Sequence, residues 1–207
     1  MSELGSLLTL SPVVPVVVVD TAEQGVGVAK ALVAGGIKVI EMTLRTPAGL
    51  EAIRAIADEV PEIVVGAGTV TTPQRAADAA AAGSQFLVSP GLTPSLLAAM
   101  KDTGLPFLPG TATVSEVLSV LEAGITEMKF FPAEQSGGAP FLSGLVTVTP
   151  DARFCPTGGI RVNTAPDYLK LANVGCIGGT WLTPADAIAA GDWERITKLA
   201  AEAAALG

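Results

Sequence analysis

The alternation of short β-branched runs with alanine-rich stretches constrains this 207-residue chain more than any other feature. Each apolar run is followed by a turn signal and then by a stretch with helical patterning. The predicted strands are the runs PVVPVVVV from Pro12, IKVIEMTL from Ile37, EIVVGAG from Glu62, QFLVSP from Gln85, LPFLPG from Leu105, TEMKFFP from Thr126, RFCPT from Arg153 and VGCIGG from Val174.

Evenly spaced strand–helix units predict an α/β fold whose parallel strands close into a (β/α)8 TIM barrel. No linker or low-complexity segment interrupts the series, so residues 1–207 are expected to form one domain. An open doubly wound sheet is the alternative, and the absence of a GxGxxG motif after the first run counts against it.

Local signals place the ends of the predicted helices. The stretches expected to be helical include Thr21–Ala34, Pro47–Glu59, Pro73–Ala82 and Val114–Ala123. Threonine precedes proline at Pro47, Pro73 and Pro94, which predicts a capping residue followed by the first helical position. Glycines that follow the stretches are expected at the C-terminal ends.

Composition limits the partners and the compartment. The net charge is −8 and no basic run occurs, so nucleic acid is not expected as a partner, and a small anionic substrate would need a local positive site. No signal peptide is apparent, and the run Val13–Val19 is too short to span a bilayer, which favours the cytoplasm and no membrane association. Cys155 and Cys176 are expected to be reduced and buried, with a redox pair as the alternative.

The chain contains no histidine. This excludes Ser-His-Asp and Cys-His catalysis as well as His-ligated zinc. No carboxylate cluster with metal-ligand spacing replaces it, so we expect neither a metal nor another cofactor. Acid–base chemistry would depend on carboxylates, Lys, Tyr, Cys or water.

Polar residues in the second predicted strand share one face. Because side chains alternate across a strand, Glu41, Thr43 and Arg45 should face the barrel axis, while Met42 and Leu44 meet the helices. Catalytic residues in such barrels come from the C-terminal ends of strands. The alternative is a purely structural Glu–Arg layer.

The sixth predicted strand places Lys129 between Met128 and Phe130. A buried ammonium is costly unless it is paired, which favours the neutral amine, the form that attacks a carbonyl. A salt bridge from Lys129 to Glu41 or Glu127 is the structural alternative, and it is compatible with catalysis.

Glycine pairs end the last two predicted strands, at Gly158-Gly159 and Gly178-Gly179. The loops after these strands often hold phosphate through backbone N–H groups, because glycine permits close approach. Two tight turns are the alternative. Thr69 and Pro90 end the third and fourth strands; Glu134 is interpreted as an exposed loop carboxylate and Tyr168 as a packing residue.

Together these residues resemble a known family. The segments that carry the resemblance are Ile40–Thr46, Gly66–Val70, Ser89–Gly91, Lys129–Glu134 and Arg153–Gly159. They are similar to signatures of bacterial 2-keto-3-deoxy-6-phosphogluconate (KDPG) aldolases of the KDPG/KHG aldolase family, in order from about Val13 to near the C-terminus. The resemblance implies a homotrimer of (β/α)8 barrels that acts in the Entner–Doudoroff pathway.

The resemblance also implies roles for individual residues. Lys129 would be the Schiff-base lysine and Glu41 the residue that transfers protons. The implied substrate-binding residues are Arg45 and Thr69 at the pyruvate carboxylate, Pro90 and Phe131 around the pyruvyl group, and Gly158, Gly159, Gly179 and Thr180 near the phosphate.

The function expected from the sequence is a metal-independent class I aldolase, a lyase that reversibly cleaves KDPG to pyruvate and glyceraldehyde 3-phosphate. The alternatives are an aldolase for 2-keto-4-hydroxyglutarate (KHG) or a galactonate epimer, an isomerase on the same scaffold, and a phosphate-binding barrel without catalysis.

Overall fold

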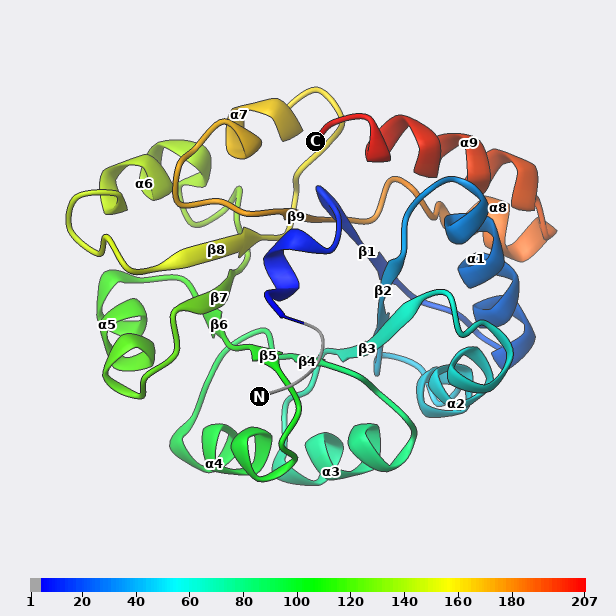
Figure 1. The fold of residues 1–207 in the computed structure, drawn as a ribbon, viewed down its shortest axis with the longest axis horizontal. Coiled ribbons are helices and arrows are strands. Elements are labelled where there is room, and N and C mark those ends of the chain that lie inside the picture. Colours follow the sequence, from blue (N-terminus) through cyan, green and yellow to red (C-terminus); the bar gives the residue numbers. More distant parts are fainter. Residues whose placement is uncertain (1–4) are drawn as a thin grey trace.

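The computed structural model describes residues 5–207. The strands within this range are β1 (Val13–Val17), β2 (Val39–Thr43), β3 (Val64–Gly68), β4 (Leu87–Val88), β5 (Phe107–Leu108), β6 (Gly110–Thr111), β7 (Glu127–Phe130), β8 (Arg153–Pro156) and β9 (Ile177–Gly179). The helices are η1 (Leu7–Thr9), α1 (Ala22–Ala34), α2 (Gly49–Glu59), α3 (Pro73–Ala81), α4 (Pro94–Asp102), α5 (Val114–Glu122), α6 (Gly138–Leu145), α7 (Ala165–Leu169), α8 (Ala185–Ala190) and α9 (Trp193–Ala204). Figure 1 shows the strands around the centre of the molecule with α1–α9 outside them.

The strands form parallel ladders in two sheets. The order in the larger sheet is β5-β4-β3-β2-β1-β9, and the order in the smaller sheet is β6-β7-β8. Two isolated parallel bridges, Phe154 to Val174 and Thr157 to Gly178, connect the end of the small sheet with the segment around β9. The fold is therefore α/β with a curled parallel sheet of six strands, which is a coarser arrangement than the continuous eight-stranded barrel expected from the sequence.

Proline explains why the fifth predicted strand is divided between the sheets. Pro109 lies between β5, which pairs with β4, and β6, which pairs with β7. Proline has no N–H to donate to a ladder, although its carbonyl still accepts a hydrogen bond of 2.9 Å from the Lys129 backbone N–H. A single predicted strand is therefore observed as two short ones.

The capping signals are confirmed at two of the three proline positions. The side chains of Thr72 and Thr93 accept hydrogen bonds from the backbone at the starts of α3 and α4. The prediction at Pro47 is wrong, because α2 begins at Gly49 without a side-chain cap. The Thr46 hydroxyl instead donates to the Val19 carbonyl oxygen at 2.6 Å, so a tertiary contact has replaced the local one.

Apolar side chains cover both faces of the strands, and each face packs against a different part of the chain. On the helix side of β7, the Phe130 ring stacks on Phe141 of α6 with centroids 5.3 Å apart. On the inner side, Leu7 from η1 lies with Val14, Val39 and other apolar side chains around Glu41. Figure 1 shows η1 in front of the ring of strands, so the N-terminal segment covers one end of the interior.

Both cysteines are free and buried, as predicted. A hydrogen bond with Cys155, together with burial, raises the pKa of the Cys176 thiol well above its ordinary value, so that thiol stays protonated at neutral pH. Within residues 5–207, no helix is long and apolar enough to cross a bilayer.

Candidate active site

An ion pair between Lys129 and Glu41 is buried on the inner face of the strands. The lysine Nζ is 3.1 Å from Glu41 Oε1 and 3.4 Å from Oε2. The two residues are 4% and 3% exposed, so both charges are almost completely removed from water. The salt bridge that the sequence offered as a structural alternative is therefore present, and the partner of Lys129 is Glu41, not Glu127. This salt bridge places the amine of Lys129, the candidate nucleophile, beside a carboxylate.

Strand alternation and a glycine position the pair. Glu41 is central in β2 and Lys129 in β7, so both project inward, whereas Met42 and Phe130 are buried on the opposite side. A Cβ atom at Gly68 on β3 would overlap the Glu41 carboxylate, so the glycine leaves the space that the carboxylate occupies. Gly68, at the end of β3, therefore leaves room for the Glu41 carboxylate on the inner face of the strands.

A cavity of about 310 Å³ lies next to this pair, on the side where the strands end. Its lining consists of Val16, Arg45, Phe131, Pro132, Gln135, Thr157, Gly158, Gly159, Ile160, Gly178 and Thr180. Val16 is the register partner of Glu41, and Thr157 follows Cys155, the register partner of Lys129, by two residues. The ion pair therefore lies at the level of strand residues that border the cavity, although neither Lys129 nor Glu41 belongs to its lining.

Arg45 supplies a positive charge to the cavity. Among the residues that line it in the described chain, Arg45 alone carries a charge at neutral pH. It follows β2 in an exposed turn, and its Nε donates to the Thr69 hydroxyl at 3.3 Å. Arg45 therefore provides a local positive charge of the kind that an anionic substrate would need on a protein with a net charge of −8.

Thr69 has an unusual backbone conformation. Its φ angle is +60°, which is rare for a β-branched residue and costs of order 1–3 kcal/mol. Its carbonyl accepts a hydrogen bond of 3.2 Å from Arg75, which helps to hold the turn. Such strain concentrates at functional sites, and here it places a hydroxyl beside Arg45.

The glycine pair after β8 forms one wall of the cavity. Gly158 and Gly159 have φ angles of +106° and +81°, which favour glycine over any residue with a side chain. At the second glycine pair, Gly178 and not Gly179 lines the cavity, because successive residues of a strand face opposite sides. A Cβ atom at Gly179 would overlap the Trp181 ring, so the absence of a side chain here leaves room for that ring.

Most of the predicted site residues come together in this region. Lys129 and Glu41 form the buried pair, and the cavity lining includes Arg45, Phe131, Gly158, Gly159 and Thr180. Thr69 reaches the cavity only through Arg45, while Pro90 and Gly179 lie outside its lining. The lining residues that were not predicted from the sequence come from strands or loops without a distinctive local pattern; they are Val16, Pro132, Gln135, Thr157 and Ile160.

Glu134 and Tyr168 make a contact that the sequence did not predict. The Tyr168 hydroxyl donates to Glu134 Oε1 at 2.7 Å, although the residues are 34 positions apart. Burial raises the pKa of Tyr168, and the Glu134 carboxylate raises it further, so the phenol remains a hydrogen-bond donor. The interpretation of Tyr168 as only a packing residue is incomplete, because its ring is buried but its hydroxyl is engaged.

Within residues 5–207, no group of three or more Cys, Asp or Glu side chains is arranged to hold a metal ion. The arrangement instead combines an amine, a carboxylate and a guanidinium around one cavity. This set can form an imine with a keto acid, move a proton and bind a carboxylate.

Comparison with known proteins agrees with that chemistry. Residues 4–199 match the family model described as KDPG and KHG aldolase. The KHG/KDPG aldolase of Escherichia coli K12 is 55% identical over 198 residues, covering 96% of this chain and 93% of the relative. The 2-dehydro-3-deoxy-phosphogluconate aldolase of Dickeya dadantii is 53% identical, with the same coverage.

Solved structures agree with the sequence matches. A KDPG aldolase from Legionella pneumophila, with pyruvate captured as a covalent carbinolamine intermediate, has a TM-score of 0.93 and 43% identity, covering 95% of this chain and 96% of that one. The KDPG aldolase of Zymomonas mobilis ZM4 with 3-phosphoglycerate also has a TM-score of 0.93, with 44% identity and coverage of 99% and 96%. This chain belongs to the KDPG and KHG aldolase family.

Proposed function

We propose that this protein is a class I aldolase that reversibly cleaves KDPG to pyruvate and glyceraldehyde 3-phosphate, with Lys129 as the Schiff-base residue. The buried Lys129–Glu41 pair, with 3.1 Å between Nζ and Oε1, carries the proposal. A binding protein has no evident need for two buried charges beside its cavity, because an apolar pair of similar size is often at least as stable. The same observation disfavours the non-catalytic phosphate-binding barrel.

The reaction begins at Lys129 Nζ. A proton passes from the ammonium to Glu41, and the neutral amine attacks the C2 carbonyl carbon to form a carbinolamine. Loss of water, with Glu41 returning a proton to the departing hydroxyl, produces an iminium. The iminium accepts the electron pair of the C3–C4 bond while a base removes the C4 hydroxyl proton, which releases the aldehyde and leaves an enamine.

The remaining steps release pyruvate. The enamine takes a proton at C3, and hydrolysis of the resulting iminium frees the lysine. Glu41 is the candidate for both proton transfers, through a water where the distance requires one. No histidine is present to perform these transfers, and the carboxylate is within hydrogen-bond distance of the nucleophile.

Binding groups on the two sides of the cavity would orient the substrate. Arg45, beside Thr69, would hold the carboxylate bidentately, and Phe131 and Pro90 would shape the pyruvyl pocket. Lys129 Nζ is 5.4 Å from the centroid of the Phe131 ring, so this ring borders the reacting atoms. Gly158, Gly159, Gly179 and Thr180 are proposed near the phosphate, where backbone N–H groups can approach an anion closely.

KHG is the second candidate substrate, because the Escherichia coli relative is named KHG/KDPG aldolase. The two substrates share the 2-keto acid group that would meet Lys129 and Arg45, but KHG lacks the phosphate. A coupled assay that measures pyruvate release from each substrate distinguishes them. We expect a higher kcat/KM for KDPG; a preference for KHG, or for the galactonate epimer, would change the assigned substrate.

Substitution of Gly159 by valine should impair phosphate binding selectively. The φ angle of +81° and a Cβ position 2.7 Å from Glu134 Cγ both require the loop to move. Hydrogen bonds to charged groups contribute about 1.5–3 kcal/mol, so we expect KM for KDPG to rise by about tenfold or more. The measurement is KM for KDPG and for KHG, with KHG little affected.

Gly124→Val is a matched control for the preceding variant. Gly124 has a φ angle of +80° but no neighbouring atom within 4 Å, and it follows α5 away from the cavity lining. This variant should share the backbone strain without the change in KM. Equal losses for KDPG and KHG in Gly159→Val would indicate that the glycine pair serves only the turn.

Activity is expected to survive exhaustive treatment with EDTA. The proposed mechanism assigns electrophilic activation to the iminium on Lys129, so it needs no Lewis acid. The rate of pyruvate release before and after chelation is the measurement. A loss that a divalent ion restores would assign the protein to the metal-dependent aldolases.

We also propose that both sheets belong to one closed (β/α)8 barrel, formed by a single domain over residues 1–207. The support is the position of Pro109 between β5 and β6 and the bridges from β8 to the β9 segment. A homotrimer is proposed from the family resemblance. Sedimentation equilibrium of the purified chain tests the trimer.

A further inference from the structure

The hydrogen bond between Tyr168 and Glu134 has no place in the mechanism above, yet it connects two loops of the site. Glu134 follows β7, the strand of Lys129, and Tyr168 belongs to α7, which follows the Gly158-Gly159 loop. The donor–acceptor distance is 2.7 Å, and the tyrosine is 1% exposed. A buried ring therefore holds the carboxylate of Glu134, a residue that is itself exposed.

The backbone around Glu134 contacts the glycine loop directly. The Glu134 N–H donates to the Gly158 carbonyl oxygen at 3.1 Å, and the Ala133 N–H donates to the Thr157 carbonyl oxygen at 2.8 Å. A Cβ atom at Gly159 would lie 2.7 Å from Glu134 Cγ. The Glu134 side chain is thus packed against the loop that is proposed to hold the phosphate.

Neighbouring side chains in this segment line different cavities. Glu134 and Tyr168 line a cavity of about 270 Å³ between α6 and α7. Gln135 lines the first cavity, together with Gly158 and Gly159. The carboxylate therefore borders the second cavity, whereas an uncharged carboxamide with two N–H donors borders the first, beside the glycine pair.

We infer that Tyr168 is a positioning residue that holds Glu134 away from the phosphate and presents Gln135 to it. This inference rests on the proposed function and names how the same site selects a phosphorylated substrate. A carboxylate free to turn into the cradle would repel the phosphate and compete for its donors. Gln135 would donate to a phosphate oxygen, which makes it a determinant of specificity.

Tyr168→Phe removes the hydroxyl and keeps the ring. A hydrogen bond to a charged group is worth enough to change an equilibrium by about tenfold, so we expect KM for KDPG to rise about tenfold, with kcat largely retained. KM for KHG, which has no phosphate, and borohydride trapping with pyruvate should stay at the wild-type level. Gln135→Ala, at an exposed position, should raise KM for KDPG in the same selective way without a risk to folding.

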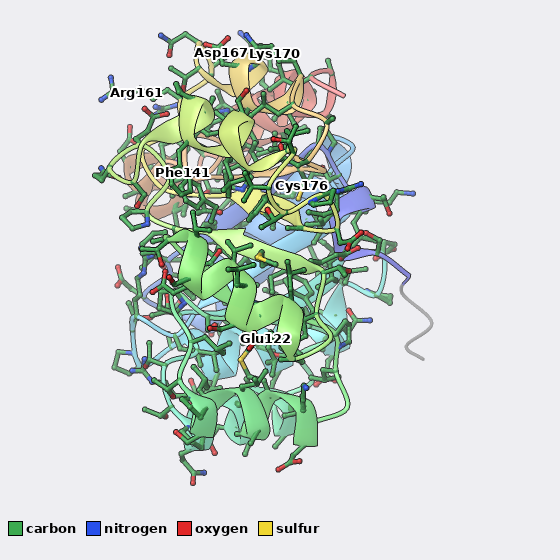
Figure 2. The ribbon with its side chains drawn as sticks, turned by 90° about the vertical axis from the view of Figure 1, so that its left-hand side faces the viewer. Glu122, Phe141, Arg161, Asp167, Lys170 and Cys176 are labelled. Carbon is green, nitrogen blue, oxygen red and sulfur yellow. The ribbon has the colours of Figure 1, made fainter. Side chains whose placement is uncertain are left out.

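Two control variants separate this role from a general structural one. Glu134→Gln keeps an acceptor for the Tyr168 hydroxyl and removes the charge, so its KM for KDPG should be no higher than that of the wild type. Asp167→Asn breaks the 2.6 Å surface pair with Lys170 on the same helix and should change nothing. Figure 2 shows Asp167 and Lys170 at the upper edge of the molecule.

The results distinguish the inference from the function on which it rests. Equal effects of Tyr168→Phe on KM for KDPG and for KHG, or an unchanged KM for KDPG in Tyr168→Phe, would overturn the positioning role while wild-type cleavage and trapping persist. An unchanged KM for KDPG in Gln135→Ala would overturn the role of Gln135. Failure of the wild-type enzyme to be trapped with pyruvate would instead overturn the proposed function, and the inference with it.

Discussion

Replacing Lys129 with alanine is expected to abolish both cleavage of KDPG and borohydride trapping with pyruvate. Without Nζ no imine forms, and the C3–C4 bond has no electron sink for its electron pair. The structure places no second lysine beside the cavity in the described chain. The measurements are pyruvate release and the mass of the borohydride-treated protein.

The same substitution should destabilise the protein. It leaves Glu41 buried opposite an alanine, and removal of one partner of a buried pair costs about 3–5 kcal/mol. A loss of activity could then reflect unfolding. The double variant Lys129→Met with Glu41→Leu removes both charges and fills the space, so it should regain much of the thermal stability and remain inactive. Full trapping in Lys129→Ala would move the nucleophile to another residue.

Replacing Glu41 with glutamine is expected to slow catalysis by about 10²–10⁴-fold, the usual contribution of general acid–base catalysis. Glutamine keeps the size and an oxygen for Lys129 but cannot carry the proton. The Schiff base with pyruvate should still be trapped after long incubation, because Lys129 and Arg45 remain, although its formation should be slower without the proton transfers of Glu41. Cleavage of KDPG and exchange of the pyruvate methyl protons with D₂O should both be slow.

Methyl exchange is the decisive measurement for Glu41, because it isolates protonation of the enamine from binding of the aldehyde. A Glu41→Gln enzyme with normal exchange would contradict the role in proton transfer. Loss of trapping in the same variant would instead indicate that Glu41 mainly sets the charge of Lys129. The 3.1 Å contact is compatible with both roles, so kinetics must separate them.

The inner and outer faces of the strands could be predicted from the sequence because side chains alternate. Glu41 in β2 and Lys129 in β7 each lie between apolar neighbours, so the period of two assigns both to the inside. Their contact spans 88 positions, and it follows once parallel strands surround a common interior. The candidate catalytic pair could therefore be predicted from the sequence.

Features that depend on tertiary contacts were not accessible. The Thr46 hydroxyl bonds to Val19 and does not cap a helix, because a partner distant in sequence was available at 2.6 Å. Glycine pairs look alike in the sequence, but in the fold Gly178 borders the cavity and Gly179 lies against the Trp181 ring. Only the folded chain brings Tyr168 to Glu134.

The most direct test of the account is reduction of the wild-type enzyme with borohydride in the presence of pyruvate, followed by peptide mapping by mass spectrometry. We expect one reduced pyruvate adduct per chain, attached to Lys129, and no labelling when pyruvate is omitted. A label on a different residue, or an unlabelled protein that still cleaves KDPG, would contradict the Schiff-base mechanism at Lys129.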